Sequence, residues 1–212
     1  ARVTGTPGMV ITTSGGGAMN VVPALAESYD SRVPVLAVVG TAPSALVGRG
    51  AFQDMLDPPD TIDLPGLLGA VTGWCGVVAS AAELPAAVDA AVRALHDDLP
   101  AALIIPKDVQ QQIMPAESTC TAPAAELLAI DVPAADERAI GALADRLVDA
   151  IAARRPICLW FGEEAARTDV LAAAELAALL DADVVVSPGG RDIGSNITGF
   201  AGVTGVMGHP SA

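Results

Sequence analysis

The stretch MVITTSGGGAMN, residues 9–20, joins a short apolar run to a cluster of three glycines. Met9–Thr13 has the length and composition of a buried β-strand. The glycines allow a tight turn, and Ala18–Tyr29 then carries apolar residues at helical spacing. Pro23 should be tolerated there because it lies in the first turns of this helix. A strand, a glycine turn and a helix in this order predict the first unit of an α/β sheet.

The same alternation of strand-like and helical patterns continues along the chain. Further strands are expected at Val33–Val39, which Gly40 should end, and at Ala101–Ile105, Pro156–Phe161 and Asp183–Ser187. Further helices are expected at Ala82–Leu95, after an N-cap at Asp136, and at Val170–Leu180 with Thr168 as its cap. Strands that are apolar throughout are typical of parallel sheets covered on both faces. The predicted fold class is therefore α/β, with doubly wound parallel sheets in two Rossmann-like domains.

A change in composition separates these two domains. Residues 115–136 contain three prolines among Ala, Ser and Thr, which is typical of a linker. The expected boundaries are therefore 1–114 for the first domain, 115–136 for the linker and 137–212 for the second domain. Both domains are expected to be incomplete, since the first opens directly on a turn and a strand and the second has only two predicted strands.

Composition excludes several classes of partner. Apolar residues make up 52% of the 212 residues and aromatic residues only 3%, so the expected core is aliphatic. Eleven basic against 25 acidic residues give a formal net charge of −14, which disfavours nucleic acid and anionic membrane surfaces. No apolar run is long enough for a membrane span, and no signal peptide is evident at the N-terminus. Three widely spaced cysteines fit reduced thiols in the cytoplasm.

Taken alone, the residues leave the function open. The glycine cluster of residues 15–17 fits either a plain strand–helix turn or a phosphate-binding loop, because it matches neither G-x-G-x-x-G nor a P-loop. Gly189–Asp192 fits either a capped turn or an anion site using Arg191. The carboxylates of Glu163 and Glu164, after a predicted strand, oppose a bound pyrophosphate. The acidic stretch Asp54–Asp63 is interpreted as a solvated loop, and no metal site is predicted.

Several ordered motifs nevertheless resemble one family. ARVTGTPG at residues 1–8 and TSGGGAMN at 13–20 are similar to "GYARxTGxPG" and "TSGPGATN" of the thiamine-diphosphate-dependent enzymes of the acetolactate synthase type. AFQD at residues 51–54 resembles that family's "AFQE", and PKDV at 106–109 is identical to its "PKDV". The resemblance implies that 1–114 is most of a pyrimidine-binding domain and that 137–212 is the front of a central domain.

The resemblance also implies a function and a set of site residues. Such enzymes decarboxylate a 2-keto acid and can add the product to a second carbonyl, using thiamine diphosphate and Mg²⁺. Their cofactor lies between subunits, which implies a homodimer or homotetramer. The cofactor-binding residues carried over are Gly16, Asn20 and Gln53. The substrate-pocket residues carried over are Ala42, Pro43, Ala51, Phe52 and Lys107, of which Lys107 suits an incoming carboxylate.

This sequence departs from the family pattern at several points. The family's catalytic glutamate precedes the "GYAR" segment and so lies before Ala1, and its "GDG…N" magnesium motif would follow residue 212. No catalytic or metal-binding residue is therefore assigned within this chain, which by itself is expected to be inactive. Gly16 replaces the family's proline and Met19 its threonine. Leu99 replaces the arginine of "GRPGP", so FAD, which acetolactate synthases bind, is expected to be absent.

Two alternatives to a catalytic role remain open. A degenerate, non-catalytic homologue acting as a binding or structural subunit is compatible with the departures at Gly16, Gly73 and Leu99. A nucleotide-binding module built on the second domain is the other alternative, although Glu163 and Glu164 count against it. The preferred hypothesis is part of a thiamine-diphosphate-dependent 2-keto acid carboligase or decarboxylase.

Overall fold

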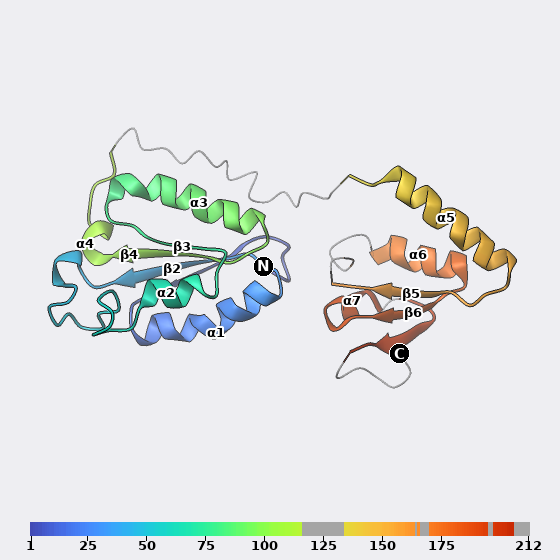
Figure 1. Ribbon diagram of the computed structural model, residues 1–212, viewed down its shortest axis with the longest axis horizontal. Coiled ribbons are helices and arrows are strands. Elements are labelled where there is room, and N and C mark those ends of the chain that lie inside the picture. The colour runs from blue at the N-terminus through green and yellow to red at the C-terminus, as the bar shows by residue number, and fades with distance from the viewer. Residues whose placement is uncertain (116–133, 164, 166–169, 195–196, 206–212) are drawn as a thin grey trace. The chain divides into compact units, whose positions relative to one another are not determined.

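The computed structural model describes residues 1–115, 134–163, 165, 170–194 and 197–205 (Figure 1). The chain divides into two compact units, unit 1 comprising Ala1–Asp131 and unit 2 comprising Val132–Ala212. Most of the predicted linker, residues 116–133, and the predicted helix cap Thr168 lie outside the described residues.

Unit 1 is built on a four-stranded parallel sheet with strand order β1-β2-β4-β3. Its strands are β1 (Gly8–Thr12), β2 (Val35–Thr41), β3 (Trp74–Val77) and β4 (Ala101–Pro106). Its helices are α1 (Gly16–Asp30), η1 (Ser44–Leu46), α2 (Leu64–Gly69), η2 (Ala81–Glu83), α3 (Leu84–His96) and α4 (Lys107–Gln110). The prediction of an α/β fold with a parallel sheet is confirmed.

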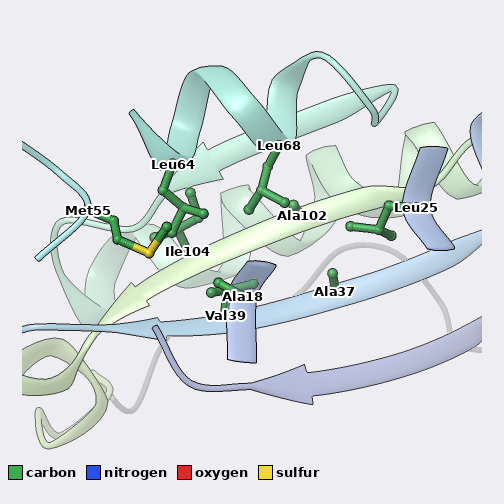
Figure 2. Close-up of a cluster of buried hydrophobic side chains, with 9 residues drawn as sticks. All are labelled: Ala18, Leu25, Ala37, Val39, Met55, Leu64, Leu68, Ala102 and Ile104. Atoms are coloured by element: carbon green, nitrogen blue, oxygen red, sulfur yellow. The ribbon is translucent and has the colours of Figure 1, made fainter. Parts of the chain in front are cut away.

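Helices cover both faces of this sheet. Figure 1 shows α3 on one face and α1 with α2 on the other. The chain runs outward from β1 through β2 to β3 and then returns to β4, and this reversal puts α3 on the opposite face, as right-handed crossovers require. The core between the sheet and α1 with α2 is aliphatic apart from one methionine (Figure 2): it contains Ala18, Leu25, Ala37, Val39, Met55, Leu64, Leu68, Ala102 and Ile104.

The first helix corrects one prediction about proline. Helix α1 begins at Gly16, two residues before the predicted start, so Pro23 lies inside the helix rather than in its first turns. Its ring removes a backbone donor there. The helix persists because Ala18 and Leu25 are fully buried against the sheet, and packing outweighs the missing hydrogen bond.

In unit 1 the structure corrects one further prediction and adds two elements that were not predicted. Strand β2 continues through Gly40 to Thr41, because β4 pairs with it along that whole length. Helix α2 was not predicted, although Asp63 caps it by accepting the N–H of Gly66 at 2.9 Å. Strand β3 was not predicted either, since its sequence Trp-Cys-Gly-Val is short and interrupted by glycine.

Unit 2 contains a three-stranded parallel sheet with strand order β5-β6-β7. Its strands are β5 (Cys158–Phe161), β6 (Asp183–Val186) and β7 (Phe200–Val203). Its helices are α5 (Glu137–Ala152), α6 (Val170–Leu180), η5 (Pro188–Gly190) and α7 (Arg191–Gly194). The cap at Asp136 is confirmed, because its carboxylate accepts from Arg138 and Ala139. Strand β7 corrects the expectation that unit 2 has two strands.

The two units differ in how much apolar surface they cover. Among the described residues of unit 2, one cluster of buried side chains is present, formed by Ala177, Val184, Val186, Ile193 and Ile197. Helix α5 has no buried residue, and the apolar stripe that predicted it remains half exposed at Ile140, Leu143 and Ile151. Among the described residues, no helix combines the length and the apolar character needed to cross a membrane.

Candidate active site

The predicted site residues of unit 1 gather at one edge of the sheet. The glycine turn of residues 15–17 follows β1, Ala42 and Pro43 follow β2, and Lys107 follows β4. Because the strands are parallel, their carboxyl ends lie at the same edge, which is where open α/β sheets bind ligands. Gln53 reaches this edge from the loop between η1 and α2.

The glycine turn is held by residues about forty positions further along the chain. The backbone N–H of Gly15 donates to Sδ of Met55 at 3.1 Å. The hydroxyl of Ser14 donates to Oε1 of Gln53 at 3.5 Å. A side chain at Gly15 would collide with Cδ, Nε2 and Cγ of Gln53, and its φ of +61° is also unfavourable for other residues. Glycine at position 15 is therefore what lets the Gln53 side chain lie across the turn.

Gly16, the next residue of the turn, faces open space. Gly16 is exposed, and a Cβ added there would meet no atom within 4 Å. Asn20 is exposed one turn further along α1. The N–H groups in the first turn of a helix have no acceptor within the helix, and the first turn of α1 carries no acidic residue. The open space at Gly16 and the exposed amide of Asn20 leave room for a ligand with hydrogen-bonding groups.

Gln53 has an unusual backbone conformation. Its φ is +56°, which residues other than glycine rarely adopt. Such conformations cost free energy and persist where the surroundings hold them, often at binding sites. Phe52 beside it is 86% exposed, so this aromatic side chain is not part of the core of the described chain. Ala51 is half-buried in the same loop.

A hydrogen-bonded contact ties the ends of β2 and β4 together. Oδ1 of Asp108 accepts the backbone N–H of Ser44 at 2.9 Å and its hydroxyl at 3.2 Å. These bonds, the backbone one first, lower the pKa of the Asp108 carboxyl. The contact fixes the start of α4, where Lys107 is exposed, next to the loop of Ala42 and Pro43. The predicted pocket residues thus share the sheet edge with the glycine turn.

Carboxylates of the acidic stretch accept hydrogen bonds from backbone N–H groups in and next to the same loop. Asp54 accepts the N–H of Gly48 at 2.7 Å and that of Leu56 at 3.0 Å, and Asp63 caps α2. Its interpretation as a solvated loop needs correction, because Met55 within it is only 3% exposed. Over the described residues, no group of three His, Cys, Asp or Glu side chains is placed to hold a metal ion.

Two other sequence features have structural roles. Gly189 and Gly190 form a capped turn, in which the hydroxyl of Ser187 accepts the N–H of Gly190 at 3.3 Å. The thiol of Cys75 is partly buried, and burial, with a smaller contribution from Asp63, raises its pKa to about 11. Cys75 is therefore a poor nucleophile at neutral pH.

Sequence reasoning missed Met55 as a site residue. It is one of five methionines, and no motif marks it. The available signal was an apolar Met-Leu pair inside a loop of aspartates and prolines. Such a pair in a polar loop indicates local burial.

Comparison with known proteins identifies the family of these residues. Residues 1–62 match "Thiamine pyrophosphate enzyme, N-terminal TPP binding domain". The chain is 32% identical over 141 residues to the mitochondrial acetolactate synthase catalytic subunit of Saccharomyces cerevisiae, covering 65% of this chain and 20% of that protein. It is 38% identical over 114 residues to acetolactate synthase of Arthrospira platensis, covering 51% and 18%. It is 35% identical over 112 residues to acetolactate synthase isozyme 2 large subunit of Escherichia coli, covering 52% and 19%.

The chain thus spans about a fifth of the length of these curated relatives. The family match includes β1, the glycine turn, α1, β2 and Gln53. Residues 1–62 therefore match the N-terminal TPP binding domain of the thiamine pyrophosphate enzymes, and the chain is acetolactate-synthase-like over this N-terminal domain.

Proposed function

We propose that this chain supplies the pyrimidine side of the cofactor site in a thiamine-diphosphate-dependent 2-keto acid carboligase or decarboxylase. One observation carries the proposal: Gln53 lies across the Gly15 turn at the carboxyl edge of the sheet, within the residues that match the family. The open space over Gly16 and the exposed amide of Asn20 support it.

In this proposal the chain's residues bind and orient rather than react. The amide groups of Asn20 and Gln53 and the Gly16 backbone would hold the aminopyrimidine ring. When bound, thiamine diphosphate supplies the electron sink for the carbon that loses carbon dioxide. Lys107 would attract the substrate carboxylate, and Phe52, Ala42, Pro43 and Ala51 would form apolar walls beside it.

Several finer features belong to the same proposal. Mg²⁺ would accompany the diphosphate group in the whole enzyme, and a homodimer or homotetramer would complete the site. FAD is proposed to be absent, because Leu99 stands at the family's arginine position and Glu163 places a carboxylate where a pyrophosphate would bind. A cytoplasmic location remains a prediction, based on the cysteine pattern.

The proposal is tested with the protein made from the complete coding sequence. Carbon dioxide release from pyruvate and longer 2-keto acids is measured with and without thiamine diphosphate and Mg²⁺. Cofactor-dependent release is expected. Absence of such release from every keto acid tested overturns the catalytic proposal and favours the binding or structural alternative.

A pair of glutamine variants then tests the site. Gln53→Ala removes an amide group from the proposed cofactor pocket and should weaken thiamine diphosphate binding about tenfold, the effect of one lost hydrogen bond to a polar ligand. Gln111→Ala removes an exposed amide from the end of α4 and should leave binding unchanged. Equal affinity in both variants would place the cofactor elsewhere.

A further inference from the structure

Met55 joins the candidate site to the core of unit 1. Its side chain is 3% exposed and belongs to the cluster of Leu64 and Ile104 on the α1 and α2 face (Figure 2). Its sulfur also accepts the N–H of Gly15 at 3.1 Å. One side chain therefore lies in the aliphatic core and contacts the backbone of the glycine turn.

The Met55 sulfur supplies the hydrogen-bond acceptor for the Gly15 N–H. Gly15 is the N-cap residue of α1 and offers no side chain for capping. A partly buried N–H that loses its acceptor keeps its full desolvation penalty. A thioether is a weak acceptor with no donor. The Met55 sulfur can therefore orient the Gly15 peptide by accepting its N–H.

Met55 also lies beside the strained residue. Gln53, two positions earlier, has a φ of +56°, a conformation that must be held by its surroundings. Asp54 between them is tied to Gly48 and Leu56 through backbone N–H groups. Burial of Met55 completes this anchoring on the carboxyl side of Gln53. The glycine turn and Gln53 therefore share one buried anchor.

We propose that Met55 is a positioning residue of the candidate cofactor site, whose sulfur sets the Gly15 peptide and, through it, the place of Gln53. The role of Met55 in cofactor binding rests on the proposed function, whereas its effect on Gly15 and Gln53 is tested without cofactor. Met55 acts through Gly15 and Gln53 and touches no reacting atom.

The test compares two exchanges of leucine and methionine in the same buried cluster. Met55→Leu keeps an apolar side chain of similar volume but removes the acceptor. Leu68→Met, at a fully buried position of the cluster, changes packing without touching the turn. Backbone amide exchange at Gly15 and the NMR signals of the Gln53 side-chain amide are measured in the 212-residue chain. Norleucine at position 55, which replaces the sulfur by a methylene group at the same length, serves as the second variant.

Met55→Leu and norleucine should speed exchange at Gly15 about tenfold relative to the amides of β2, and should shift the Gln53 side-chain signals. Leu68→Met should do neither. If the exchange rate at Gly15 is unchanged in both position-55 variants, the Met55 sulfur does not hold the Gly15 N–H and the proposal fails. Faster exchange with unshifted Gln53 signals overturns the positioning role. If both position-55 variants lose folded signals throughout unit 1 while Leu68→Met keeps them, Met55 is a core residue only and the proposal fails.

Titration with thiamine diphosphate separates this inference from the proposed function. In the protein made from the complete coding sequence, the signals of Gly16 and Asn20 should shift on titration in the presence of Mg²⁺, and in Met55→Leu the same shifts should need a higher concentration. If thiamine diphosphate shifts neither signal at any concentration while Met55→Leu still releases Gly15 and Gln53, the cofactor proposal fails and the anchoring by Met55 stands.

Discussion

Two glycine turns of the molecule can be compared directly. The turn at Gly15–Gly17 links β1 to α1, a helix of 15 residues, and the turn at Gly189–Gly190 links β6 to α7, a helix of four residues. In sequence, both turns fit either a plain turn or an anion-binding loop. The structure differentiates them by what lies against the glycines.

Neutral side chains contact the first turn, whereas a carboxylate lies beside the second. Gln53 and Met55 reach Gly15 from about forty positions away, with an amide and a thioether. At the second turn, Ser187 accepts from Gly190 and the Glu163 side chain lies close to Gly189. A carboxylate beside a short helix opposes an anion, whereas neutral polar groups beside a long helix leave its positive end available. The surroundings of a glycine turn, more than its glycines, therefore indicate binding.

The largest expected effect is at Gly15. Gly15→Ala puts a side chain at a φ of +61° and displaces Gln53, so the free energy of unfolding of unit 1 should fall by about 3 kcal/mol. Urea unfolding followed by Trp74 fluorescence in a Trp160→Phe background reports unit 1 alone, because the chain has two tryptophans, one in each unit. Gly16→Ala, with open space around it, is the control and should cost much less. Equal effects at both positions would mean that the turn is not constrained.

The second turn should respond through its backbone contacts. A Cβ at Gly190 would lie 2.8 Å from the carbonyl oxygen of Phe161 and 2.9 Å from that of Gly162. Gly190→Ala should therefore destabilise unit 2 by about 2 kcal/mol and leave unit 1 unchanged. Hydrogen exchange at Val184, compared with Ile104 in unit 1, measures both effects in one sample. Gly162→Ala, which meets no neighbouring atom, should accelerate neither. Destabilisation of both units together would contradict the independence of the two turns.

Long periodic segments made most of the fold predictable. Helices α1, α3, α5 and α6 and strands β1, β2, β4, β5 and β6 follow from apolar patterns that local sequence carries. Elements α2, β3 and β7 were missed because each is short and contains glycine, so pairing and packing rather than propensity create them. Pro23 is a further case, because packing keeps it inside helix α1 despite its low helix propensity.

The candidate site was predictable only where a motif marks it. Asn20 and Gln53 lie in ordered motifs, and so the resemblance to a family names them as candidates. The role of Met55 depends on a contact spanning 40 positions and on the buried face of a loop, neither of which a single sequence records. The positive φ of Gln53 is likewise a consequence of tertiary anchoring, since glutamine has no preference for it.

A smaller and opposite effect is expected at Gly16. Gly16 is the first residue of α1, where proline is favoured because the N–H has no helical acceptor. Gly16→Pro should raise the free energy of unfolding of unit 1 by about 0.5 kcal/mol, because proline lowers the conformational entropy of the unfolded chain. It should also weaken thiamine diphosphate binding if the Gly16 N–H is used by the ligand, so urea unfolding and cofactor titration are measured together. Loss of stability would show that the backbone at Gly16 is incompatible with the φ of proline.

The smallest effect concerns the contact between Asp108 and Ser44, which fixes Lys107 at the same sheet edge. Hydrogen bonds from Ser44 lower the pKa of Asp108, so the charged carboxylate favours the folded state. This contribution is present above the ordinary aspartate pKa of about 3.9 and is lost as the pH falls through the lowered folded value. The wild type should therefore melt slightly higher than Asp108→Asn at neutral pH, and the difference should close in acid. Ser44→Ala removes the hydroxyl donor but keeps the backbone N–H of residue 44. In a Ser44→Ala background, the difference in melting temperature caused by Asp108→Asn at neutral pH should therefore be smaller but still present. A difference in melting temperature that stays constant from neutral pH into acid would mean that this carboxylate contributes through packing rather than charge.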